Sequence, residues 1–183
     1  MRTVAQIIDD LITREGGFSD HPSDRGGATR WGVTEQVARV FGYDLAMADL
    51  PRVVAVKIYR KRYWEAPGFF EVDGIFPTLA VEMFDTGVNM GPTVPIKFLQ
   101  RALNALNKRG SDWSDMAVDG VIGPMTIAAL RRFKAQRGRL AETVLLRCVD
   151  GLQLARYLDI TEARPANEDF FFGWVATRIG ALS

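Results

Sequence analysis

Residues 3–18 read Thr-Val-Ala-Gln-Ile-Ile-Asp-Asp-Leu-Ile-Thr-Arg-Glu-Gly-Gly-Phe. Apolar side chains recur in this stretch at helical spacing, at positions 4, 7, 8, 11 and 12. The pattern predicts an amphipathic helix over residues 3–15, which the two following glycines end. Glu15 comes four residues after Leu11 and three after Ile12, so it extends the apolar face of this helix. The sequence therefore puts a carboxylate where an apolar side chain is expected.

The predicted surroundings of Glu15 favour its protonated form. The last turn of a helix is the negative end of the helix dipole, where a cation is preferred. Apolar neighbours disfavour a charge as well, so both effects raise the pKa of the carboxyl group. A carboxyl group with a raised pKa suits a general acid that works near neutral pH.

The loop that follows is dense in Gly, Asp, Thr and aromatic residues over positions 15–34. Glycines let a backbone approach a ligand closely. Asp24 lies nine positions after Glu15, and Thr29 lies five after Asp24. Two carboxylates and a hydroxyl on one tight loop can flank a single scissile bond, and glycosidases use such a carboxylate pair.

Other interpretations of this loop compete with catalysis. Aspartates such as Asp20 and Asp24 commonly cap turns, and that is the more frequent role of an Asp-rich loop. A calcium loop would need regularly alternating oxygen ligands and a closing Glu, and a phosphate loop would need a Gly-x-x-x-x-Gly-Lys motif. Asp20, His21 and Asp24 are a weak signal for a transition metal. We therefore expect no metal and no cofactor.

Composition limits the class of protein. The chain has 183 residues, 48% of them hydrophobic, with eleven Phe and four Trp, which is enough for a packed core in one domain or in a domain with a small appendage. The net charge of +1 selects neither nucleic acid nor an acidic membrane. The single cysteine cannot form an internal disulfide.

Hydropathy predicts neither a membrane span nor a Sec-type signal peptide. No run of eighteen apolar residues occurs, and Asp9 and Asp10 interrupt the apolar run at the N-terminus. We expect synthesis in the cytoplasm without stable membrane insertion. A substrate outside the cytoplasm would have to be reached with the help of other proteins.

Helical periodicity dominates the rest of the chain. Caps, glycines and prolines predict helices over residues 35–41, 51–64, 77–89, 94–107, 124–136, 140–158 and 170–179. Strand signals are poor, except for a short irregular β-like excursion over residues 17–33. This predicts an all-α fold with a β-like loop after the first helix. The best internal boundary lies at residues 91–93 and divides the chain into regions 1–92 and 93–183, which we expect to pack as one compact unit.

Several motifs occur in an order that resembles glycoside hydrolase family 108 with its peptidoglycan-binding region. They are Glu15-Gly16-Gly17-Phe18, Asp24-x-Gly26-Gly27-x-Thr29-x-x-Gly32-Val33-Thr34, Tyr59-x-x-x-Tyr63-Trp64, Phe84-Asp85-x-Gly87-Val88-Asn89-x-Gly91, Val118-Asp119-Gly120-x-Ile122-Gly123-Pro124-x-Thr126 and Phe172-Gly173-Trp174-x-x-x-Arg178. Members of this family are N-acetylmuramidases of phage endolysins and of bacterial secretion-linked lysozymes.

The resemblance implies a lysozyme-like helical fold and cleavage of the β-1,4 bond between N-acetylmuramic acid and N-acetylglucosamine. It implies that Glu15 is the essential catalytic acid. The spacing of Glu15, Asp24 and Thr29 also resembles the Glu–Asp–Thr arrangement of phage-type lysozymes, in which the Asp and the Thr position a water. The resemblance covers nearly the whole chain and implies peptidoglycan glycan strands as the partner.

Three further residues are candidates for substrate contact, each with a structural alternative. Trp31 can stack on a sugar ring or cover the first helix. Tyr63 belongs to an aromatic stripe at helical spacing, which is more often core than groove. Asn89 stands near two glycines and suits a cleft, but it can equally cap a helix. Asp85 lies within an apolar helix, so it needs a buried partner or a function.

A basic run without acids begins in the helix predicted over residues 124–136 and continues past its end, at positions 131, 132, 134, 137 and 139. Peptidoglycan stem peptides carry free carboxylates, so this run can hold the wall. A solvated helix face is slightly favoured over that interpretation. Nucleic acid is a weaker alternative, because few aromatic residues stand near the run to stack on bases.

Two alternative functions share these features. A lytic transglycosylase would use the same Glu, with the muramic 6-hydroxyl in place of water. A non-catalytic adaptor would bind the wall and tolerate substitution of Glu15. For the hydrolase, we expect a monomer that acts on the cell wall in the periplasm after release or export, through a holin or an export system.

Overall fold

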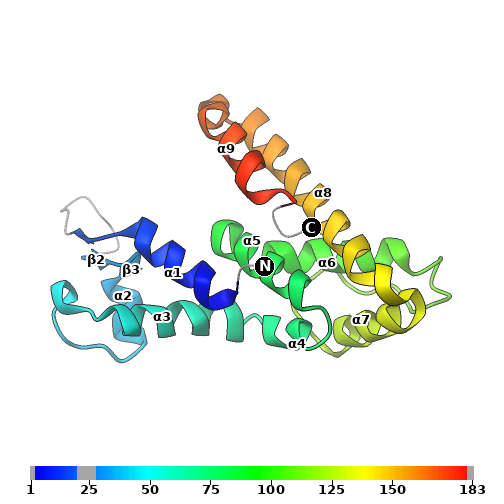
Figure 1. Ribbon diagram of the computed structural model, residues 1–183, viewed down its shortest axis with the longest axis horizontal. Helices are drawn as coiled ribbons and strands as arrows, with labels where there is room; N and C mark the ends of the chain where they lie inside the picture. The colour runs from blue at the N-terminus through cyan, green and yellow to red at the C-terminus, as the bar shows by residue number, and fades with distance from the viewer. Residues whose placement is uncertain (1–2, 20–27, 181–183) are drawn as a thin grey trace. The chain divides into compact units, whose positions relative to one another are not determined.

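The computed structural model describes residues 3–19 and 28–180. Asp24, together with Asp20 and His21, lies outside the described residues. The chain forms two compact units, residues 2–66 and residues 67–183 (Figure 1). Among the described residues no helix is long and apolar enough to cross a membrane.

The first unit begins with α1 (Val4–Glu15). Thr3 and Gln6 form a capping box at its start: Thr3 Oγ1 accepts from the Gln6 amide at 3.2 Å, and Gln6 Oε1 accepts from the Thr3 amide at 2.8 Å. The apolar stripe predicted from the sequence is buried against the unit, with Ile12 fully inaccessible to solvent. This face packs on α3 (Arg52–Arg60). The predicted helix and its inward face are confirmed.

A small antiparallel sheet follows α1. Its strands are β1 (Phe18–Ser19), β2 (Thr29–Arg30) and β3 (Val33–Thr34), in that order across the sheet. The turn between β2 and β3 consists of Trp31 and Gly32, with φ of 57° and 70°. Positive φ at both central residues is the pattern of a type I′ turn, whose twist matches that of the strands. The predicted β-like excursion is therefore a short, tightly turned hairpin with one added strand.

The first unit closes with short helices. Thr34 caps α2 (Glu35–Val40) by accepting from the Val37 amide. A 3₁₀ turn, η1 (Met47–Asp49), leads into α3, and α3 continues into a π-helical turn, η2 (Lys61–Glu65). The single helix predicted over residues 51–64 is thus one helical segment whose last turn is widened.

In the described part of the second unit, all regular secondary structure is helical, and a loop over residues 107–123 separates α6 from α7. Its elements are α4 (Phe69–Asp73), α5 (Pro77–Met90), α6 (Thr93–Leu106), α7 (Pro124–Arg137), η3 (Gly138–Leu140), α8 (Ala141–Glu162), η4 (Pro165–Asn167) and α9 (Glu168–Arg178). The core is built from fully buried side chains such as Phe69, Phe84, Leu99 and Phe133. Figure 1 shows α9 folding back along α8, and the two helices are in contact. The all-α class with a short β segment is confirmed.

The turn before α7 is fastened to α6 by one buried side chain. Gln100 donates to Asp119 Oδ1 at 2.8 Å and accepts from the Gly120 amide at 2.9 Å. Asp119 Oδ1 also accepts from the Val121 amide, and the Gln100 bond holds the pKa of the Asp119 carboxyl group below its usual value. Gly120 has φ of 79°, and a Cβ there would overlap Cγ2 of Thr93. The Asp-Gly pair of the motif is therefore required by close packing against α6.

Candidate functional site

Glu15 is the last residue of α1, and its side chain lies outside the described part of the structure. The next residue ties this helix end to the hairpin: Gly16 donates back to the Ile12 carbonyl at 3.2 Å and accepts from the Trp31 amide at 3.2 Å. Gly16 has φ of 64°, a conformation that suits glycine. The end of α1 and the β2–β3 turn are thus joined through the backbone.

Thr29 lies on the strand next to this helix end. It pairs with Ser19 of β1 on one side and with Thr34 of β3 on the other, and it is half-buried. Pairing on both sides fixes the backbone of Thr29. The structure therefore brings the hairpin that carries Thr29 together with the end of the helix that carries Glu15.

Trp31 holds the hairpin turn in place. Its indole Nε1 donates to the Leu50 carbonyl at 2.9 Å, and its own carbonyl accepts from the Tyr59 hydroxyl at 3.2 Å. The Arg30 guanidinium lies 5.2 Å from the centre of its ring. A non-glycine residue at positive φ costs about 1–3 kcal/mol and persists only where its surroundings enforce it. The polar group of Trp31 is thus used inside the protein, while its ring remains partly exposed.

Tyr63 lies in the π-helical turn η2 and is half-exposed. Its ring stacks on Tyr59, with centroids 5.8 Å apart and planes 24° from parallel, and Arg62 lies 5.9 Å from its centre. π-Helical turns are frequent at functional sites. Tyr59 therefore connects Tyr63 to Trp31, a role that was not predicted, although the spacing of Tyr59 and Tyr63 placed both on one helix face.

Asn89 belongs to the second unit, in the last turn of α5. Its side chain is exposed, and Nδ2 donates to the Asp85 carbonyl at 2.6 Å. One amide hydrogen is thus used within its own helix.

Asp85 has a buried partner. Arg178 of α9 donates to its Oδ2 at 2.9 Å, and the side chains of Arg178 and Asp85 are 14% and 13% exposed. Nearby, Glu82 is buried and its Oε1 accepts from the Thr86 hydroxyl. Burial, assisted by the neighbouring carboxylates of Asp150 and Asp85, raises the pKa of Glu82 to about 8. The position of Asp85 within an apolar helix is therefore explained by its ion pair with Arg178 of α9. Of the two alternatives drawn from the sequence, a shielded partner or a function, this is the first.

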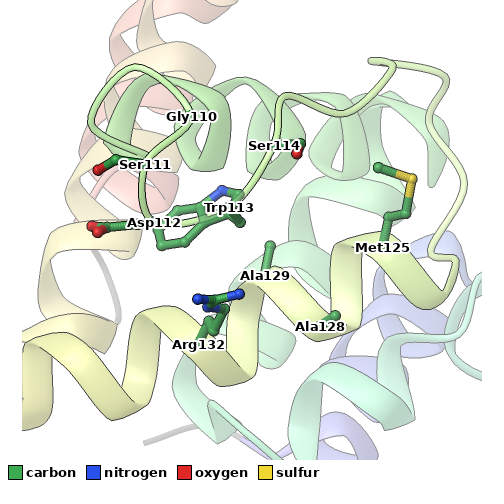
Figure 2. A pocket seen from close by; sticks show the side chains of 9 residues that line it. All are labelled: Gly110, Ser111, Asp112, Trp113, Ser114, Met125, Ala128, Ala129 and Arg132. Carbon is green, nitrogen blue, oxygen red and sulfur yellow. The ribbon is translucent and has the colours of Figure 1, made fainter.

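A pocket opens in the second unit between the loop 110–114 and α7 (Figure 2). It has a volume of about 340 Å³, and α7 contributes Met125, Ala128, Ala129 and Arg132 to its wall. Figure 2 shows the Trp113 ring between the loop and α7, with Asp112 on the loop and Arg132 on α7. Sequence reasoning identified Arg132 only as one member of the basic run and did not predict a pocket beside it.

The comparisons with known proteins divide the chain into two segments. Residues 8–91 match the family described as Glycosyl hydrolase 108, and residues 94–179 match the one described as Predicted Peptidoglycan domain. The chain thus combines a glycosyl hydrolase 108 domain with a peptidoglycan domain. It is thus a lysozyme-type glycoside hydrolase that acts on peptidoglycan, as the motifs of the sequence indicated.

A solved structure resembles the whole fold. The structure of Brucella abortus SagA matches with a TM-score of 0.61 and 24% sequence identity, over 97% of this chain and 90% of that chain. At this identity the likeness concerns the fold, and it agrees with a lysozyme-like helical architecture. No curated protein sequence matches the chain significantly.

Proposed function

We propose that this family 108 enzyme is an N-acetylmuramidase that hydrolyses the β-1,4 bond between N-acetylmuramic acid and N-acetylglucosamine, with Glu15 as the general acid. One observation carries the proposal: the amide of Trp31 donates to the carbonyl of Gly16, beside the last residue of α1. This bond fixes the hairpin that bears Thr29 against the helix end that bears Glu15. An acid and a water-positioning hydroxyl are thereby held on adjoining elements.

In the proposed reaction, Glu15 transfers its proton to the glycosidic oxygen as the bond to the muramic anomeric carbon breaks. Positive charge develops on the muramic ring, which is the oxocarbenium-like state of glycoside hydrolysis. Asp24 and Thr29 orient a water that attacks the anomeric carbon, and Asp24 accepts the proton that this water loses. Proton exchange with solvent then returns both carboxyl groups to their starting states. The products are an N-acetylmuramic acid reducing end and a free 4-hydroxyl on N-acetylglucosamine.

Support for Glu15 comes from the buried face that precedes it. Ile8, Leu11 and Ile12 are 2%, 7% and 0% exposed, and Glu15 continues their helical spacing. The second group, Asp24, is proposed from its spacing to Glu15. Trp31, Tyr63 and Asn89 are proposed as substrate contacts, Trp31 and Tyr63 through their ring faces and Asn89 through its exposed amide.

We also propose that residues 1–92 form the catalytic region and residues 93–183 the wall-binding region, and that the enzyme acts as a monomer. The two family matches, which end at residue 91 and begin at residue 94, support this division. On this proposal the enzyme reaches the periplasmic wall through a holin or an export system.

Product analysis tests the proposed bond and reaction. Purified peptidoglycan is digested in H₂¹⁸O and the fragments are analysed by mass spectrometry. A muramidase yields reducing N-acetylmuramic acid ends that carry ¹⁸O. Anhydro-muramic ends without ¹⁸O would instead identify a lytic transglycosylase, and reducing N-acetylglucosamine ends would identify cleavage of the other glycosidic bond. An absence of new ends would leave only an adaptor role.

A further inference from the structure

The loop 107–115 is built around one buried asparagine. Asn107 is 2% exposed, its Nδ2 contacts Asp115 Oδ1 at 2.5 Å, and its Oδ1 accepts from the Gly110 amide at 3.0 Å. Three successive residues, Lys108, Arg109 and Gly110, have φ of 53°, 61° and 80°. Left-handed backbone at two non-glycine residues is costly, and such strain clusters at ligand sites. The loop is therefore held in one conformation that forms the pocket wall.

The pocket combines an apolar wall with hydrogen-bonding groups. Trp113 is 8% exposed and packs edge-on against Phe133, with centroids 6.0 Å apart and planes at 87°. Ala128 and Ala129 of α7 add small side chains beside it, and Ser111 and Ser114 contribute hydroxyls. A volume of about 340 Å³ lies at the small end of ligand pockets. These features fit a small apolar group such as a methyl side chain.

The charge of the pocket is positive. Its one acid, Asp112, is held by Arg137 at 2.9 Å and by Lys108 at 3.7 Å, so its charge is compensated. Arg132, on the other wall, forms no ion pair within the described part of the chain. A guanidinium in a pocket whose one acid is compensated attracts an anion, and a carboxylate is a planar group that it binds well.

Three other cations of the basic run lie elsewhere or have contacts of their own. Lys134 donates to the Ile75 carbonyl at 2.6 Å and lies over the ring of Phe76, and Arg137 pairs with Asp112. Arg131 lines a different pocket, together with Glu71. Arg132 is thus the member of the run that lines this pocket.

We propose that this pocket binds the free carboxyl end of a short peptide with small apolar side chains, the chemistry of an uncrosslinked peptidoglycan stem. Arg132 would bind the terminal carboxylate, and Trp113 with the two alanines would receive the terminal methyl group. The proposal rests on the proposed function in one respect, that the polymer held by the second region is peptidoglycan. Such a site would direct the enzyme to wall that carries free stem ends.

The test uses the full chain carrying Glu15→Gln, so that the binding measurement is independent of catalysis. The probes are N-acetyl-D-alanyl-D-alanine and its C-terminal amide, titrated while the four tryptophan indole N–H signals are followed by ¹⁵N NMR. Trp113→Phe assigns the Trp113 signal. The free acid should shift that signal in a saturable way, and the amide should bind about tenfold or more weakly, because a charge-assisted hydrogen bond is lost.

Arg132→Gln should weaken binding of the acid by about ten- to hundredfold. Arg131→Gln is the matched control, because Arg131 is a neighbouring exposed cation on the same helix. It should leave binding of the free acid unchanged. Thermal unfolding checks that both variants fold. Equal binding of acid and amide, equal loss in the two variants, or no shift of the Trp113 signal would overturn the proposal.

A second measurement uses the polymer itself. The Glu15→Gln protein should sediment with intact sacculi several times more than with glycan strands stripped of their stems by an amidase, and Arg132→Gln should abolish this difference. Equal sedimentation of the Glu15→Gln protein with both substrates would contradict the proposal. The product analysis can fail to show muramidase activity while the protein still sediments more with intact sacculi than with stripped strands. That result would support the stem-binding site and reject only the proposed reaction.

Discussion

Arg178 in α9 donates to Oδ2 of Asp85 in α5 at 2.9 Å, and neither side chain is more than 14% exposed. The residues are 93 positions apart, so this pair fastens the C-terminal helix to the core of the second unit. Trp174 of the same helix stacks on Tyr157 of α8, with centroids 5.2 Å apart. The ion pair with α5 and the ring stack with α8 together explain why α9 stays packed against both helices, although its Phe170 and Phe172 are exposed.

Asp85→Ala should destabilise the second unit by about 3 kcal/mol, since removing one partner of a buried pair leaves an uncompensated charge. Glu35→Ala is the control, because it breaks the Arg39–Glu35 pair at 2.6 Å, where the side chains are 35% and 42% exposed. That change should cost less than about 1 kcal/mol. Urea unfolding followed by circular dichroism measures both, and similar costs for the two variants would refute the structural role of the buried pair.

Stability should fall as the pH rises from mildly acidic to weakly alkaline values. Burial of Glu82, with the carboxylates of Asp150 and Asp85 nearby, raises the pKa of Glu82 from 4.5 to about 8, although the Thr86 hydrogen bond and Arg178 oppose the shift. Between these values the folded state keeps a proton that the unfolded state has released. The contribution to stability is therefore complete below pH 4.5, is lost as the pH rises through this window, and levels off above pH 8.

The slope from Glu82 should approach about 1.4 kcal/mol per pH unit inside the window, the value for one proton. Burial also raises the pKa of Asp150, so Asp150 acts in the same direction. Denaturant midpoints measured from pH 5 to pH 8 should decline in the wild type and decline much less in Glu82→Gln. Parallel curves for the two proteins would contradict the assignment to Glu82.

Gly120→Ala should destabilise the protein by about 2–4 kcal/mol, from the left-handed backbone and from overlap with Thr93. Gly110→Ala is the matched control for Gly120→Ala. Gly110 has a similar φ of 80°, but a Cβ at this position would have no atom within 4 Å. Gly110→Ala should lower the free energy of unfolding only by the cost of left-handed backbone at a non-glycine residue, about 1–2 kcal/mol. Thermal unfolding of the two variants separates strain from overlap, and equal shifts would mean that contact with α6 has no role.

Tyr59→Phe should lower kcat by up to about fivefold, since the lost hydrogen bond to the Trp31 carbonyl is worth about 1 kcal/mol and steadies the hairpin. Tyr43→Phe removes a comparable exposed bond, to the Ala46 carbonyl at 3.2 Å, and should leave the rate unchanged. Turbidity clearing of purified peptidoglycan gives both rates. A Tyr59→Phe enzyme as fast as Tyr43→Phe would exclude a role for Tyr59 in positioning the hairpin.

Most of the helices could be predicted because their apolar spacing and caps are local signals. The short helix α4 was not predicted, since five residues after Pro67-Gly68 are too few to show a period. The π-helical turn at η2 also escaped, because the same aromatic spacing fits an ordinary helix. The partner of Asp85 could not be found from the sequence, as a contact across 93 positions leaves no local pattern.

The catalytic roles of the candidate site residues stay predictions, while the structure adds the backbone that carries them. Glu15 and Thr29 followed from helical spacing and loop composition, and the register of β2 now fixes the backbone of Thr29. The left-handed conformation of Trp31 was not foreseen, because type I′ turns favour Asn, Asp or Gly at that position. Its bonds to Leu50 and from Tyr59 join segments far apart in the chain. The pocket beside Arg132 required the fold of the 107–115 loop, which polar composition alone does not specify.

The most direct test of the central claim is the initial rate at which Glu15→Gln clears purified peptidoglycan, compared with wild type and with Glu162→Gln. Glu162 is also the last residue of a helix, α8, and it is exposed, so its substitution controls for loss of a helix-end carboxylate. We expect Glu15→Gln to lose activity by at least about a hundredfold, the range expected for a general acid, while it folds normally and Glu162→Gln stays fully active. A Glu15→Gln protein that clears peptidoglycan at near the wild-type rate would contradict the assignment of Glu15 as the proton donor.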